Sequence, residues 1–123
     1  MLTVAFLILT TAVLIGIVLA ILHARGETAW RVPWPVGVLH GLIGICGFVC
    51  LLLALRGPPR GLDQGMASFG MIGAGLIALA VLVGLAIFIT FRTKQRGRAG
   101  TLIGIHATLA VSGFVILAAY VFA

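Results

Sequence analysis

The stretch VGVLHGLIGICGFVCLLLAL, residues 36–55, is an unbroken apolar run that contains one histidine, His40, and no residue that is charged at neutral pH. A helix needs about 20 apolar residues to cross the hydrocarbon core of a bilayer. Three more runs of this kind cover residues 2–22, 66–91 and 101–122. Because these runs are uniformly apolar rather than alternating, they predict helices and not barrel strands. We therefore expect an all-α membrane protein with four transmembrane helices in an up-down bundle.

The composition of the 123-residue chain agrees with this fold class. Apolar residues make up 63% and charged residues 8% of the sequence, far from the balance of a soluble globular protein. The first run has no basic segment before it and is too long for the core of a signal peptide, so we interpret it as the first helix. The links between the runs are too short for a soluble domain.

The net charge of +6 lies almost entirely in the links between the expected helices. The first link contains Arg25 and Arg31, the middle link Arg56 and Arg60, and the third link Arg92, Lys94, Arg96 and Arg98. Basic residues mark cytoplasmic loops, so links 23–35 and 92–100 are predicted to face the cytoplasm and both termini to lie outside. We expect a plasma membrane of the bacterial inner-membrane type, with the lipid bilayer and not nucleic acid as the partner of this charge.

The sequence contains an internal repeat. The motif AVLIG of residues 12–16 recurs as AVLVG at residues 80–84, and His40 and His106 are each followed seven residues later by Gly-Phe-Val. Short matches among apolar residues arise by chance, but two matches in the same order, with histidine aligned on histidine, favour duplication.

The repeat predicts two tandem helical hairpins, residues 1–55 and 66–123, joined by a linker at residues 56–65. Each hairpin has two spans, so both insert in the same direction and are related by a pseudo-two-fold axis along the membrane normal. The whole chain then forms a single four-helix transmembrane domain.

The two histidines inside the spans are the candidate ligand-binding residues. Ionisable side chains inside a membrane are costly and usually functional. His40 and His106 both lie about 8–9 Å inside the start of their expected helices. Gly16 and Gly84 of the other two helices fall at the same level, and we expect them to leave room for a flat ligand.

Further small residues share the faces of the two histidines. Gly44 and Gly47 lie on the face of His40, and Gly113 lies on the face of His106. These glycines let a planar ligand approach the backbone, or they bring helices close together without any ligand. The second interpretation fits Gly70, Gly73 and Gly84 on the third helix equally well.

Haem iron is the ligand that best satisfies two opposed imidazoles, because imidazole nitrogen is a common axial ligand. Helices on a bundle diagonal are about 11–14 Å apart, which suits His40 and His106 with an iron between them. We expect the propionates at the cytoplasmic side. Side chains that can receive them there are Arg25, Arg31, Arg96, Arg98, Trp30 and Trp34, although topology and the interfacial aromatic belt also explain these residues.

With four spans and the pair His40 and His106, the chain resembles the cytochrome b561-like proteins and other four-helix, bis-histidine membrane b-type cytochromes. The resemblance implies one haem b with these histidines as axial ligands to the metal. It also implies electron exchange with a quinone, ascorbate or a partner oxidoreductase. Members with two haems have four such histidines, whereas this chain has one buried pair, so the resemblance implies at most one haem.

The remaining chemical groups point to no independent enzyme. His23 is expected at the membrane interface, and Cys46 and Cys50 are one turn apart and suit packing. The only carboxylates, Glu27 and Asp63, are in links, so a proton-coupled exporter is not favoured.

Two functions remain open. The first is a haem b electron-transfer protein. The second is a cofactor-free subunit, assembly factor or scaffold of a larger membrane complex, in which each histidine bonds to a backbone carbonyl or hydroxyl. Binding of a chlorophyll-type pigment or a transition metal is a third interpretation, and a homodimer is compatible with the glycine-rich outer faces.

Overall fold

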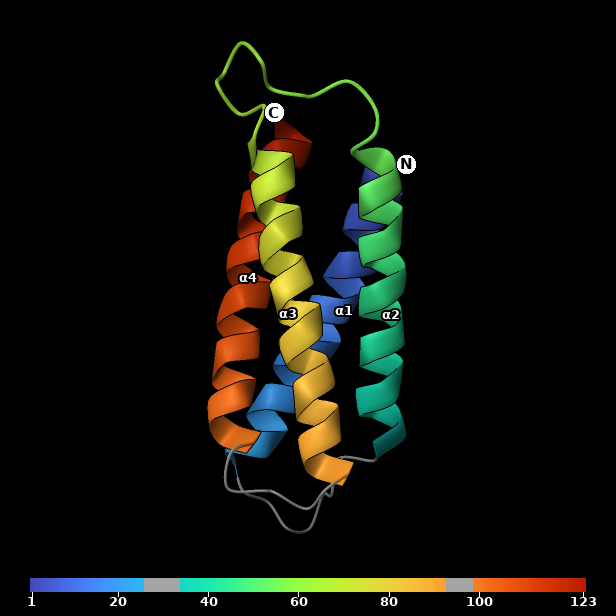
Figure 1. Cartoon of the computed structure of the whole chain (residues 1–123), viewed down its shortest axis with the longest axis vertical. Coiled ribbons are helices and arrows are strands. Elements are labelled where there is room, and N and C mark those ends of the chain that lie inside the picture. The colour runs from blue at the N-terminus through green and yellow to red at the C-terminus, as the bar shows by residue number, and fades with distance from the viewer. Residues whose placement is uncertain (26–33, 93–98) are drawn as a thin grey trace.

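The computed structural model describes residues 1–25, 34–92 and 99–123. These residues form four helices: α1 (Leu2–Ala24), α2 (Trp34–Ala54), α3 (Phe69–Arg92) and α4 (Ala99–Phe122). The helices run alternately up and down, and both termini lie at the same end as the α2–α3 link (Figure 1). The predicted all-α, four-helix fold class is therefore confirmed.

The helices pack in a ring. The α1 helix contacts α2 and α4, and α3 contacts the same two helices, so α2 and α4 lie on one diagonal of the bundle and α1 and α3 on the other. A half-turn about the long axis of the bundle exchanges α1 with α3 and α2 with α4. The arrangement thus has the approximate two-fold relation that the internal repeat predicts.

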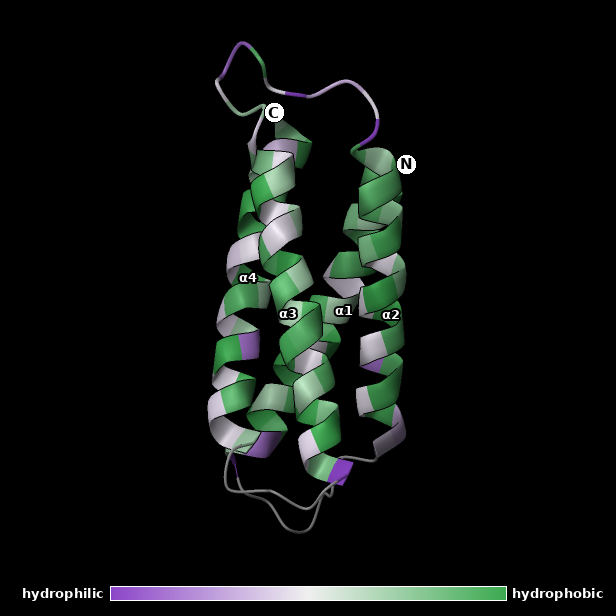
Figure 2. Cartoon of the chain, viewed as in Figure 1, coloured by the Kyte–Doolittle hydropathy of each residue, from purple (hydrophilic) through white to green (hydrophobic). Residues whose placement is uncertain are grey.

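All four helices are long and apolar enough to cross a membrane. Figure 2 shows that the helices are mostly apolar along their length, while most hydrophilic residues gather at the two ends of the bundle. Hydroxyls within the helices bond to the carbonyl four residues earlier, as Thr10 does to Phe6 and Thr108 to Gly104. The chain is an integral membrane protein whose helices present apolar side chains to lipid.

The end of α1 and the starts of α2 and α4 each lie two residues beyond the expected runs. The start of α3, in contrast, lies later than expected. The sequence places the start of this run at residue 66, but the helix begins at Phe69. Gly61 and Gly65 adopt positive φ angles, and the amide of Met66 bonds back to the carbonyl of Gly61 at 2.8 Å. The turn closes on Met66, the first residue that hydropathy assigns to the helix, and a second turn from Met66 to Phe69 precedes the helix.

The core is thin and repeats between the hairpins. Leu51 of α2 and Leu117 of α4 are 66 positions apart and are both fully buried. Ala12 of α1 and Ala80 of α3, which are 68 positions apart, are also both buried.

Within each hairpin the two helices pack closely at a glycine, and these two glycines occupy matched positions of the repeat. A Cβ added to Gly47 would meet Leu9 of α1 at 2.9 Å, and one added to Gly113 would meet Ile77 of α3 at 3.0 Å. Both glycines therefore let the helices of their hairpin approach closely.

Candidate functional site

His40 projects from α2 toward α1. It lies six residues after the start of α2, about 9 Å inside the helix. Its Nδ1 atom is 3.0 Å from the carbonyl oxygen of Ala12. A carbonyl oxygen can only accept a hydrogen bond, so Nδ1 carries the proton and donates it. In the neutral ring the lone pair then lies on Nε2.

His106 repeats this arrangement in the second hairpin. It lies seven residues after the start of α4, about 10 Å inside the helix, and its Nδ1 atom is 2.8 Å from the carbonyl oxygen of Ala80 on α3. The same argument places the proton on Nδ1 and the lone pair on Nε2. The expectation that both histidines lie at similar depth agrees with these positions.

Glycines one turn after the two alanines make room for the imidazoles. A Cβ added to Gly16 would lie 2.9 Å from Cε1 of His40, and one added to Gly84 would lie 3.2 Å from Cε1 of His106. The space beside each glycine is therefore filled by the edge of a histidine ring. A flat ligand that also fits between the two rings stays a prediction.

The two imidazoles approach each other near the long axis of the bundle, between the diagonal helices α2 and α4. Their ring centres are 5.9 Å apart, and the ring planes are inclined at 81° to each other. Neither Nε2 atom has a hydrogen-bond partner among the described residues. Both histidines are half-buried, and no unpartnered side-chain nitrogen in the described residues is fully sealed, so each Nε2 retains accessible surface.

The separation of the ring centres, 5.9 Å, is close to that of two imidazoles on one metal ion. Imidazole nitrogens bind metals at about 2.0 Å, which places the ring centres of two opposed ligands about 6.3 Å apart. The described residues contain no group of three or more histidine, cysteine or carboxylate side chains that could hold a metal. Two protein ligands suit a metal that brings its own equatorial donors, as haem iron does.

The other glycines predicted to share the site lie elsewhere. Gly47 and Gly113 pack against side chains of the neighbouring helix, two turns from the histidines. A Cβ added to Gly44 would meet no heavy atom outside its own turn within 4 Å. Close helix packing explains Gly47 and Gly113 directly, and a role of these three glycines in cofactor binding stays a prediction.

The end of the bundle nearest the histidines carries basic and aromatic side chains. His23 of α1 forms an edge-to-face contact with Phe91 of α3 at 6.5 Å, and the Arg92 guanidinium lies 5.3 Å from the centre of the Phe88 ring. His23 thus lies at the end of the bundle, apart from the histidine pair. The expected propionate-binding residues Trp30, Arg31, Arg96 and Arg98 lie outside the described residues, as do Glu27 and Lys94.

The carbonyl groups of Ala12 and Ala80 were not predicted as partners of the histidines. A signal for them was present, because both alanines open the repeated motif that ends in Gly16 and Gly84. Backbone acceptors carry no side-chain signature, so only the close approach of the helices identifies them.

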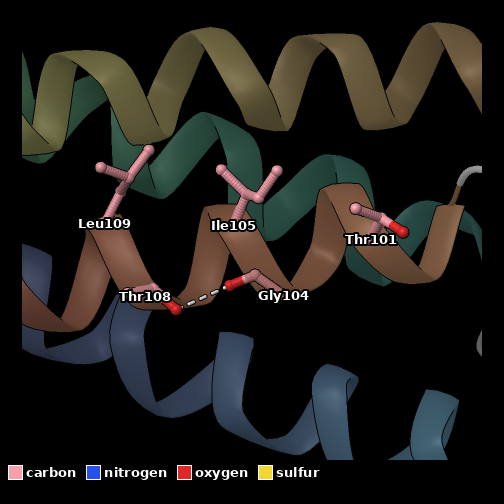
Figure 3. Close-up of a pocket in the computed structure, with 5 residues that line it drawn as sticks. All are labelled: Thr101, Gly104, Ile105, Thr108 and Leu109. Atoms are coloured by element: carbon pink, nitrogen blue, oxygen red, sulfur yellow. Dashed lines mark hydrogen bonds between the residues drawn. The ribbon is translucent and has the colours of Figure 1, made fainter.

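A shallow depression on α4 is separate from the histidine pair. It is lined by residues of one helix face, namely Thr101, Gly104, Ile105, Thr108 and Leu109 (Figure 3). His106 lies about 100° around the helix from Ile105, so its side chain leaves a different face.

No protein-family model matches the chain, and no curated protein or solved structure is significantly similar to it.

Proposed function

We propose that this protein is a membrane b-type cytochrome that binds one haem b between His40 and His106. Its role is electron transfer with a quinone or with a partner oxidoreductase in the same membrane. The haem, when bound, supplies an iron that accepts and releases one electron. The protein supplies two axial imidazoles and an apolar surrounding, both of which tune the potential of such an iron.

One observation carries the proposal: both imidazoles use Nδ1 in a hydrogen bond to a backbone carbonyl, at 3.0 Å and 2.8 Å, and keep Nε2 free. Histidines that bind metals commonly donate their other ring nitrogen to a carbonyl or carboxylate, which orients the ring and raises its basicity. The ring separation of 5.9 Å supports a shared metal between them.

The position of the pair supports a haem near one membrane face. The histidines lie nearer the end of the bundle where α1 and α3 end, and the links after these helices, together with Arg92 at the end of α3, contain six of the eight basic residues. Positive charge at that end supports a cytoplasmic location for it in a bacterial inner membrane, with both termini outside. Arg25 and Arg92 are exposed at the same end, where a carboxylate of the cofactor can reach the surface.

A second candidate function is a cofactor-free subunit or assembly factor of a larger membrane complex. The observation that favours it is the same pair of hydrogen bonds, because each histidine already has a partner for its one proton. In this alternative Gly16 and Gly84 only accommodate the imidazole rings.

An absorption spectrum separates the two functions. The protein purified from haem-replete cells should be red, with the spectrum of low-spin, six-coordinate haem and one haem per chain. A colourless protein that is folded and contains both histidines would exclude the cytochrome and favour the subunit. Extraction of a chlorin in place of haem, or a bare metal found by elemental analysis, would also contradict the proposal.

A further inference from the structure

Each histidine reaches a carbonyl group that a side chain would normally cover. In an α-helix the carbonyl of Ala12 points toward residue 16, one turn later, and the Cα–Cβ bond of residue 16 tilts back toward that carbonyl. Glycine at position 16 leaves the carbonyl open to His40 from the neighbouring helix. The same relation holds in the second hairpin, with Ala80, Gly84 and His106.

We infer that Gly16 and Gly84 are positioning residues that hold both imidazoles in the tautomer with the proton on Nδ1, so that both Nε2 atoms are free to bind one metal. The inference deepens the proposed function and rests on it for the identity of the ligand. The positioning itself is a property of the protein without the ligand.

The apolar surroundings make this selection strong. A neutral imidazole has one N–H, and burying that donor without a hydrogen-bond partner is unfavourable. The carbonyl oxygens of Ala12 and Ala80 are the acceptors within reach of His40 and His106 in the described residues. The tautomer with the proton on Nε2 would lose this bond and place a lone pair opposite a carbonyl oxygen.

The contact at each glycine predicts what an added methyl group does. At Gly16 the nearest atom is Cε1 of His40 at 2.9 Å, and the next two are the ring nitrogens at 3.6 Å. All three belong to a side chain and none to a backbone, so the helices can stay in place while the imidazole rotates away. The added methyl group of Gly84→Ala lies 3.2 Å from the His106 ring and should displace it less.

The test measures the tautomer directly by nitrogen NMR of histidine-labelled protein in lipid, prepared from cells depleted of haem. Protonated and unprotonated imidazole nitrogens have well-separated shifts, and His40→Gln and His106→Gln assign the signals. Wild-type protein should show Nδ1–H at both positions. Gly16→Ala should move His40 toward Nε2–H and leave His106 unchanged, and Gly84→Ala should do the reverse to a smaller extent.

Two glycines of the histidine-bearing helices α2 and α4 have open space beside them and serve as controls. A Cβ added to Gly41 or to Gly104 would meet no heavy atom within 4 Å outside its own turn, so Gly41→Ala and Gly104→Ala should leave both tautomers unchanged. Nε2–H at either histidine in wild-type protein would overturn the inference. An unchanged His40 tautomer in folded Gly16→Ala would also overturn it. If Gly16→Ala fails to fold, the tautomers of His40 and His106 in the wild-type protein alone test the inference.

A haem titration distinguishes this inference from the proposed function. Loss of a hydrogen bond behind a metal ligand weakens binding by about 10–100-fold, so Gly16→Ala should bind haem that much more weakly than Gly41→Ala. A wild-type protein with Nδ1–H tautomers that binds no haem would refute the cytochrome and retain the positioning. Haem binding of wild-type strength in Gly16→Ala would refute the positioning and retain the cytochrome.

Discussion

The imidazole centres of His40 and His106 lie 5.9 Å apart, although the described backbones of their helices, α2 and α4, do not contact each other. The two side chains therefore span the diagonal of the bundle. Each side chain donates a hydrogen bond to a backbone carbonyl of a neighbouring helix, His40 to α1 and His106 to α3. This relationship makes the pair, rather than either histidine alone, the centre of the candidate site.

Replacement of either histidine of the pair should abolish low-spin haem. His40→Ala and His106→Ala each leave one axial ligand, so we expect a high-spin spectrum or a loss of haem from the purified protein. His23→Ala is the matched control and should keep one low-spin haem per chain, because His23 contacts Phe91 at the end of the bundle. Equal haem loss in all three variants, with the fold intact, would contradict axial ligation by the pair.

The crossing of α3 and α4 should not tolerate larger residues. A Cβ on Gly73 would lie 3.1 Å from the carbonyl oxygen of Gly113, and a Cβ on Gly113 would lie 3.1 Å from that of Gly73. These neighbours are backbone atoms, so the helices themselves must separate. We expect Gly73→Ala and Gly113→Ala each to lower the free energy of unfolding in mixed detergent by about 1–3 kcal/mol.

A control for this crossing is Gly75→Ala, because a Cβ at Gly75 meets no heavy atom within 4 Å outside its own turn. It should be neutral or slightly stabilising, since alanine favours the helix over glycine. Destabilisation by Gly75→Ala of the same size would show that the loss comes from the glycine itself and not from the crossing.

Truncation of the two matched core leucines should lower the free energy of unfolding by similar amounts. Leu51 and Leu117 are both fully buried, and truncation to alanine leaves a cavity that the neighbouring helices fill only in part. We expect each variant to lose about 2–3 kcal/mol of unfolding free energy. Leu42→Ala, at a site that is 60% exposed to lipid, should lose far less. A loss confined to one of the two buried leucines would contradict the matched packing of the hairpins.

The hydroxyl of Tyr120 should hold the link between the hairpins. It accepts a hydrogen bond from the backbone N–H of Arg60 at 3.1 Å, and the tyrosine ring is 4% exposed. Tyr120→Phe keeps the ring and removes the acceptor, so we expect a loss of about 1 kcal/mol and faster amide hydrogen exchange at Arg60. Unchanged exchange at Arg60 would show that this bond does not form in the membrane.

Labelling of single introduced cysteines tests the orientation of the chain in the membrane. In a background with Cys46→Ala and Cys50→Ala, Asp63→Cys should react with a membrane-impermeant thiol reagent in intact cells. Ala24→Cys, at the opposite end of the bundle, should react only after permeabilisation. The reason is the excess of basic residues in the links that follow α1 and α3. The reverse pattern would place both termini in the cytoplasm.

The helices were predictable because apolar length is a local property. Hydropathy placed all four spans, but α3 begins at Phe69 rather than at residue 66, because the turn that starts at Gly61 closes on Met66, the first residue of the apolar stretch. The histidine pair was also predictable, since an ionisable residue inside a span is conspicuous in any sequence. The role of Gly47 was not, because a glycine that packs two helices and one that borders a ligand look alike.

The order and the apolar length of the segments in the sequence are enough to predict four membrane-spanning helices, and the repeated motifs predict two similar hairpins. The atoms that the histidines contact follow only from the packing of the helices. The carbonyl oxygens of Ala12 and Ala80 become acceptors when a neighbouring helix brings an imidazole within 3.0 Å and 2.8 Å of them. Backbone atoms are the same in every residue, so their use depends on how the helices pack and not on the residues that carry them.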